Sequence, residues 1–206
     1  MSDAQDYRKQ LGDEVASLFG GEFRFYRSRL ELRRKVPGGN DVVILAGASK
    51  WSPHLSISFY FGRHFDLVRE VEKQCRLPPA PYHIQQYSLN LRSMKGMAYG
   101  GPYTWDVDLT RPPADIAREI KAAIEGMAYP FFERFQNLLS ARDALANGDS
   151  WCFSGRDVGW RFVFLADAVL DDLAHFRQWS ACLDPFYAKQ AQAMLDGYHP
   201  GGGNKG

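Results

Sequence analysis

The chain lacks most of the features that mark specialised protein classes. Its 206 residues include three cysteines, Cys75, Cys152 and Cys182, which are too few and too irregularly spaced for a disulfide framework or a zinc motif. No apolar run approaches the roughly 18 residues of a spanning helix, and the polar N-terminus has no apolar signal core. We therefore expect a cytoplasmic protein that does not enter a membrane.

Net charge is nearly absent as well. A formal charge of +1 argues against overall attraction to nucleic acid or to anionic lipid. The Gly-Lys-Ser loop that binds phosphates is missing, and so is the Gly-x-Ser-x-Gly turn of many hydrolases. Asp106 and Asp108 lie two apart, but no histidine accompanies them at ligand spacing. The sequence thus predicts no cofactor and no metal site, and it leans against an enzyme.

What the chain does contain is a strand-forming pattern between Arg24 and Gly62. Apolar and polar residues alternate there with a period of two, which is typical of half-buried strands. We expect three consecutive antiparallel strands at Arg27–Lys35, Asp41–Ala48 and His54–Gly62. The first would have a solvated basic face and a buried face that includes Leu30 and Leu32. Pro37–Asn40 has the composition of a hairpin turn.

The remaining pattern completes an α+β fold. Two more strands are predicted at Tyr82–Ser93 and Tyr103–Leu109. Helices are predicted at Tyr7–Phe19, Asp66–Gln74, Pro112–Met127, Leu138–Ala146, Phe162–Phe176 and Phe186–Leu195. Pro130 is expected to break or restart a helix.

These elements predict a mostly antiparallel sheet of about five strands, with helices packed on one face and a helical C-terminal lobe. We expect a single domain over residues 1–198, strand-rich over 1–109 and helical over 110–198, with a flexible tail at 199–206.

Two groups of residues are candidates for binding. The first is the basic strand face, formed by Arg27, Arg29, Arg33 and Lys35, which is suited to phosphates or to an acidic protein. The same pattern is also typical of a plain solvated strand, where charge prevents aggregation. The second group is His54, Tyr60, Arg63 and His64, in which histidine offers proton transfer near neutral pH. An ordinary exposed strand face explains these residues equally simply.

A family resemblance adds one further expectation. The stretch Phe25–Phe65 resembles a family of bacterial domains of unknown function that have a helix, an antiparallel meander and trailing helices. The resemblance includes the sequence Ser-Ile-Ser-Phe-Tyr-Phe-Gly near the end of this stretch. Tyr129–Phe135 is similar to the helix restart of that family, and the resemblance extends to about Trp151. Such domains are similar to immunity proteins that neutralise polymorphic toxins. The resemblance implies no particular site residues.

Three functions follow as hypotheses. The preferred one is a non-catalytic bacterial protein-binding domain with a toxin as its partner, that is, an immunity protein. The alternatives are an enzyme or small-ligand binder that uses the polar sheet face, and a nucleic-acid binder that uses the basic strand.

Overall fold

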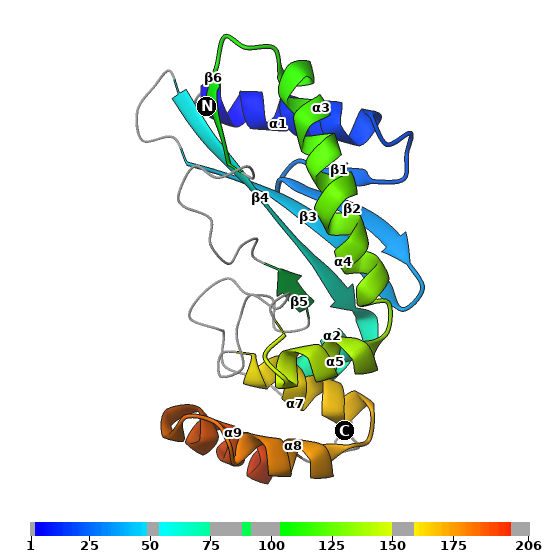
Figure 1. Ribbon diagram of the computed structural model, residues 1–206, viewed down its shortest axis with the longest axis vertical. Coiled ribbons are helices and arrows are strands. Elements are labelled where there is room, and N and C mark those ends of the chain that lie inside the picture. The colour runs from blue at the N-terminus through cyan, green and yellow to red at the C-terminus, as the bar shows by residue number, and fades with distance from the viewer. Residues whose placement is uncertain (1–2, 49–53, 75–87, 92–103, 150–158, 199–206) are drawn as a thin grey trace, which may run out of the picture. The chain divides into compact units, whose positions relative to one another are not determined.

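The computed structural model describes residues 3–48, 54–74, 88–91, 104–149 and 159–198 (Figure 1). The strands are β1 Arg24–Tyr26, β2 Glu31–Val36, β3 Gly39–Ala48, β4 His54–Phe65, β5 Ser88–Leu91 and β6 Thr104–Asp108. The helices are α1 Asp3–Ser17, α2 Asp66–Gln74, α3 Pro113–Ala123, the π-helix η1 Ile124–Ala128, α4 Tyr129–Arg134, α5 Leu138–Ala146, α7 Trp160–Val169, α8 Leu173–Ser180 and α9 Pro185–Gly197. The predicted tail at 199–206 lies outside the described residues.

The contacts divide the chain into two compact units. Unit 1 comprises residues 1–63 and 91–134, and unit 2 comprises residues 64–90 and 135–206. Most of the strands belong to unit 1, whereas unit 2 is mainly helical. The predicted α+β class with a helical C-terminal region is confirmed, and the expectation of a single domain stays a prediction.

The sheet has the strand order β1-β2-β3-β4-β5, and β6 also pairs with β4. The pairings β1–β2, β2–β3 and β4–β6 are antiparallel. The β2–β3 hairpin closes with Val36 opposite Gly39, so its loop is the dipeptide Pro37–Gly38. Gly38 has φ of +71°, a conformation that glycine adopts at little cost. The hairpin predicted at Pro37–Asn40 is therefore present.

The predicted first strand is wrong in its N-terminal half. Residues 27–30 form a turn between β1 and β2, and Leu30 lies there with φ of +55° instead of packing as a strand residue. Arg29 N–H donates to the Tyr26 carbonyl at 3.0 Å, which closes this turn. Splitting one expected strand into two gives six strands where about five were expected.

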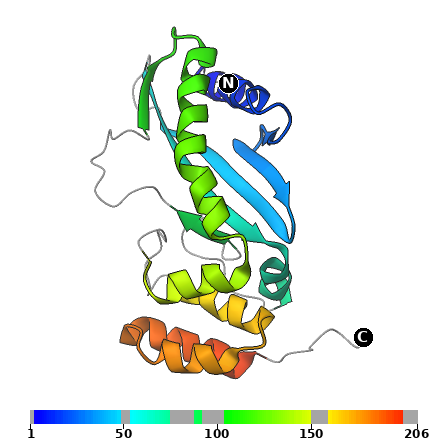
Figure 2. The ribbon, with the colours of Figure 1, turned by 45° about the vertical axis from the view of Figure 1, so that its right-hand side comes forward.

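One face of the sheet in unit 1 carries helices, as predicted. Figures 1 and 2 show α1 and the run α3-η1-α4 lying across the strands. Phe61 of β4 packs edge-on against Phe131 and Phe132 of α4, with ring centres 5.5 and 6.2 Å apart. Phe25 of β1 packs against Gly12 of α1 so closely that an added Cβ would lie 2.0 Å from its ring. Burial of Phe61, Phe131 and Phe132 contributes to the hydrophobic stabilisation of unit 1.

The helix break predicted at Pro130 does not occur. Helical structure runs without interruption from Pro113 to Arg134, and the segment Ile124–Ala128 is π-helical. Proline has no N–H to donate to the carbonyl four residues earlier, so a helix around it loses a hydrogen bond. A wider π-turn directly before Tyr129 and Pro130 accommodates that loss without ending the helix.

The predicted long helix from Phe162 to Phe176 is two helices. Helix α7 ends at Val169, and Asp171 adopts φ of +55° in the turn that follows. The Asp172 side chain then caps α8 by accepting from His175 N–H at 3.3 Å. The apolar spacing continues across the turn, which explains why periodicity alone suggests one helix.

Candidate functional site

Two of the four basic residues predicted on one strand face are paired with neighbouring carboxylates. Arg27 lies in the β1–β2 turn and pairs with Asp13 at 2.7 Å. Arg33 pairs with Glu31 at 2.5 Å, and Glu31 is buried instead of standing on a solvated face. Arg29 is exposed in the turn, and Lys35 is exposed on β2. The predicted basic face is therefore not one continuous solvated surface.

The second predicted group does not converge on a site. His54 and Arg63 are nine residues apart on the same strand, a separation of about 30 Å at the strand rise. His54 is exposed and Tyr60 is half-buried, whereas Arg63 and His64 are both buried. One small ligand cannot contact both ends of this group. The histidines and the tyrosine nonetheless stay candidates individually.

Arg63 belongs instead to a buried ionic network in unit 1. The Asp41 carboxylate is fully buried and accepts from Arg63 at 2.5 Å and from Arg34 at 2.9 Å. Arg34 and Asp41 are direct cross-strand partners on β2 and β3, so the sheet register places them together. Two arginines on one buried carboxylate satisfy its desolvated charge.

Arg34 also joins this network to aromatic rings and to Glu22. Its guanidinium lies 4.7 Å from the ring centre of Tyr129 and 5.5 Å from that of Phe23, and it pairs with Glu22. The Tyr129 hydroxyl donates to Glu22 at 2.7 Å. Burial, reinforced by that hydrogen bond, raises the pKa of Tyr129. These contacts hold the segment after α1 against α4, a structural role.

Tyr26 and two arginines form a group that we call the Tyr26 platform, defined as Arg24, Tyr26 and Arg33, in which Arg24 and Tyr26 are exposed and Arg33 is half-buried. The guanidinium carbons of Arg24 and Arg33 lie 5.4 and 5.2 Å from the Tyr26 ring centre. Tyr26 is 37% exposed, and its strand β1 stands at the end of the strand order. Arg24 and Arg33 are direct cross-strand partners, which explains how both reach the same ring.

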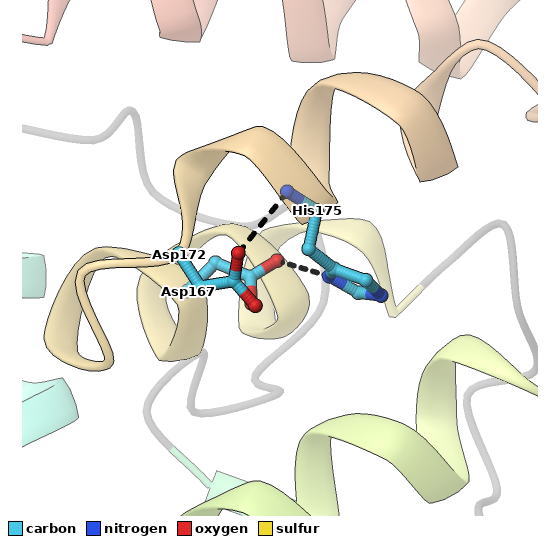
Figure 3. A group of neighbouring side chains, drawn as sticks. All are labelled: Asp167, Asp172 and His175. Carbon is cyan, nitrogen blue, oxygen red and sulfur yellow. Dashed lines mark hydrogen bonds and ion pairs between the residues drawn. The ribbon is translucent and has the colours of Figure 1, made fainter.

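A second polar cluster lies in unit 2, where Asp167 of α7, Asp172 before α8 and His175 of α8 lie together (Figure 3) and Arg142 of α5 joins them. Asp167 is fully buried, and Arg142 is nearly so. Nη1 of Arg142 lies 2.5 Å from Oδ1 of Asp167 and 3.2 Å from Oδ2 of Asp172. Nδ1 of His175 lies 2.7 Å from Oδ2 of Asp167. Three helices are thereby joined through one buried carboxylate.

The electrostatics of this cluster are set by burial and by Arg142. Burial raises the pKa of Asp167, although His175 and Arg142 both act in the opposite direction. The pKa of Asp172 is lowered, first because Arg142 donates a hydrogen bond to it. Nε of Arg142 lies 2.7 Å from Asp143, yet it makes no hydrogen bond of good geometry among the described residues. The arginine is therefore held mainly through Nη1.

The same cluster includes the atoms of a possible metal site. One oxygen each of Asp167 and Asp172 and one ring nitrogen of His175 lie within 4.8 Å of one another. Both oxygens of Asp167 already face Arg142 and His175, and both oxygens of Asp172 face Arg142 and the His175 amide. A cation placed between these carboxylates would stand beside the Arg142 guanidinium and be repelled by it. The geometry therefore fits an ion-pair network better than a metal centre.

Sequence reasoning missed this cluster, although one signal for it exists. Asp167 interrupts the otherwise apolar run Phe162–Val169, and Arg142 follows Leu138–Ala141 in a similar way. A charged residue inside an apolar helical stretch is rarely buried without a partner. Each therefore predicts a buried partner of opposite sign. Pairing the two with each other needs the fold, because 25 residues separate them.

Comparison of the chain with protein-family models, with curated proteins and with solved structures finds no match. Within the residues that the structure describes, no helix has both the length and the apolar character needed to cross a bilayer.

Proposed function

We propose that this protein is a non-catalytic protein-binding domain that acts in the cytoplasm through the Tyr26 platform. The observation that carries the proposal is the exposed Tyr26 ring flanked by the guanidinium groups of Arg24 and Arg33. Tyrosine and arginine are enriched among the residues that dominate protein–protein binding energies. The platform also differs from the interior networks, because Tyr26 is partly exposed to solvent.

A non-catalytic role is supported by the arrangement of the chemically capable groups. The group His54, Tyr60, Arg63 and His64 is spread along one strand. In the unit 2 cluster, both oxygens of Asp167 and both oxygens of Asp172 already have a nitrogen partner. The resemblance of the β-meander to immunity-protein-like domains suggests the finer proposal that the partner is a bacterial toxin. The enzyme and nucleic-acid hypotheses stay predictions.

The test is capture of a partner by the native chain and by two matched variants. Tyr26→Ala removes the platform ring, whereas Phe186→Ala removes an exposed ring of α9 that is 67% exposed. We expect a partner that binds the native chain and the Phe186→Ala variant, but binds the Tyr26→Ala variant at least about tenfold more weakly, as for an interface hot spot. Equal retention by both variants would show that the platform is not the binding surface.

The immunity role needs a second readout. The captured partner should arrest growth when it is expressed alone, and co-expression of the native chain should restore growth. Co-expression of the Tyr26→Ala variant should restore growth less well. A captured partner that is harmless on its own would contradict the immunity role and leave the binding role standing.

A further inference from the structure

The charge left uncompensated around the Tyr26 platform is positive. Arg33 is paired with Glu31 and Arg27 with Asp13, so neither adds net charge to this surface. Arg24 and Arg29 are exposed, and neither has an ion pair in the part of the chain that the structure describes. The Arg24 guanidinium therefore remains 5.4 Å from the Tyr26 ring centre without a carboxylate partner within the described ranges, and Arg29 adds a second exposed positive charge in the adjoining turn.

The position of Arg24 leaves one guanidinium without a carboxylate. It stands directly across from Arg33 in the β1–β2 pairing, and of these two residues only Arg33 has an ion pair among the described residues. Arg29 lies in the adjoining turn, where its N–H donates to the carbonyl of Tyr26. Carboxylates from a partner would meet both unpaired guanidinium groups, in the planar geometry that arginine recognises best.

We propose that the Tyr26 platform binds an acidic protein segment, with its carboxylates on Arg24 and Arg29. This inference rests on the proposed function and adds the chemistry of the partner. Charge complementarity of this kind speeds association and rejects partners of the wrong sign more than it adds affinity. Binding should therefore weaken as salt rises through physiological strength, about 150 mM, where screening acts over about 8 Å.

A nucleic acid is the less suitable occupant. Binding to a phosphate backbone draws on a run of unpaired cations, each of which releases counterions. On β1, β2 and their turn, Arg27, Arg33 and Arg34 are already paired with Asp13, Glu31 and Asp41. Arg24, Arg29 and Lys35 are the other basic residues of this segment, and so small a number suits a few carboxylates better than a phosphate chain.

The experiment measures fluorescence anisotropy of a labelled glutamate decamer titrated with the full chain at low and at physiological salt. The test variant is Arg24→Glu with Arg29→Glu. The control is Arg177→Glu with Lys189→Glu, which makes the same change in net charge at exposed positions of α8 and α9. Circular dichroism checks that both variants fold. A labelled oligothymidylate and a lysine decamer serve as comparison probes.

We expect the dissociation constants of the glutamate decamer for the native chain and for the control variant to agree within about twofold. The Arg24→Glu, Arg29→Glu variant should bind it at least about tenfold more weakly, which corresponds to about 1.4 kcal/mol. Equal weakening by both variants, tighter binding of the oligothymidylate, or no binding of the decamer at low salt would each overturn the inference. If the decamer does not bind but the Tyr26→Ala substitution still weakens binding of the captured partner, only the acidic chemistry of the partner is refuted. The proposed function then stands.

Discussion

Replacing Asp167 by alanine would test the cluster in unit 2 most directly. The Asp167 side chain is 0% exposed and that of Arg142 is 6% exposed, with Nη1 and Oδ1 2.5 Å apart. Removing one member of a buried ion pair costs about 3–5 kcal/mol, because the other charge stays buried without its partner. Arg142 would keep its ion pair with Asp172, whose side chain is 44% exposed. We therefore expect the free energy of unfolding to fall by about 3 kcal/mol, the lower end of that range.

The assay is urea unfolding, combined with hydrogen exchange of the α7 and α8 amides. With a slope of about 1–3 kcal/mol per molar urea, this loss would move the midpoint down by about 1–3 M. Exchange should accelerate in α7 and α8, because the Asp167–His175 contact joins these helices. Asp196→Ala, at an exposed position of α9, is the control and should stay within about 0.5 kcal/mol of the native chain.

A double variant separates the ion pair from simple packing. Arg142→Met with Asp167→Leu replaces both charges by apolar groups of similar size, which is often neutral for stability. We therefore expect the double variant to be more stable than Asp167→Ala, with a coupling energy of about 1–3 kcal/mol between the two sites. An Asp167→Ala variant within about 1 kcal/mol of the native chain would refute the reasoning, and so would additive effects of the two substitutions.

Two further predictions concern unit 1. Gly12→Ala should lower the melting temperature, since the new Cβ would lie 2.0 Å from the Phe25 ring and overpacking costs about 1–3 kcal/mol. In Gly126→Ala the new Cβ meets no atom within 4 Å, and this variant should gain about 0.5–1 kcal/mol of stability. Equal shifts of the melting temperature in the two variants would argue against the packing of Phe25 on α1. Burial and the Glu22 hydrogen bond raise the pKa of Tyr129 in the folded state. The stability that Tyr129 contributes is therefore complete below its pKa in the unfolded chain, about 10, and is lost as pH rises through its pKa in the folded chain. Tyr129→Phe should therefore flatten the alkaline fall in stability measured by urea unfolding, and an unchanged pH profile would contradict this assignment.

Much of the sheet could be predicted because its signals are local. The alternation over His54–Gly62 places Leu55, Ile57 and Phe59 on a buried face, and all three are fully buried. The failures occurred where one residue departs from a regular conformation. Leu30 and Asp171 both adopt positive φ. Leucine rarely does so, and aspartate does so far less readily than glycine, so neither residue type marks its turn clearly.

The candidate sites were less predictable because they depend on register and on packing between distant segments. The alternation predicts that Arg33 and Glu31 share a strand face, and they do, but it cannot show that they pair with each other. The Tyr26 platform needs the β1–β2 pairing, which places Arg24 opposite Arg33. Residue type and spacing alone do not contain that information.

The strand β4 has a consequence for how this protein can be divided experimentally. It runs from His54 to Phe65 and leads directly into α2, while the border between units falls at Arg63 and His64, inside the strand. The chain then returns to unit 1 near Leu91 and leaves it again after Arg134. Each unit is thus assembled from two separate stretches of sequence. Neither can be expressed by a single truncation, and excision of either one would require joining two chain ends with a new linker.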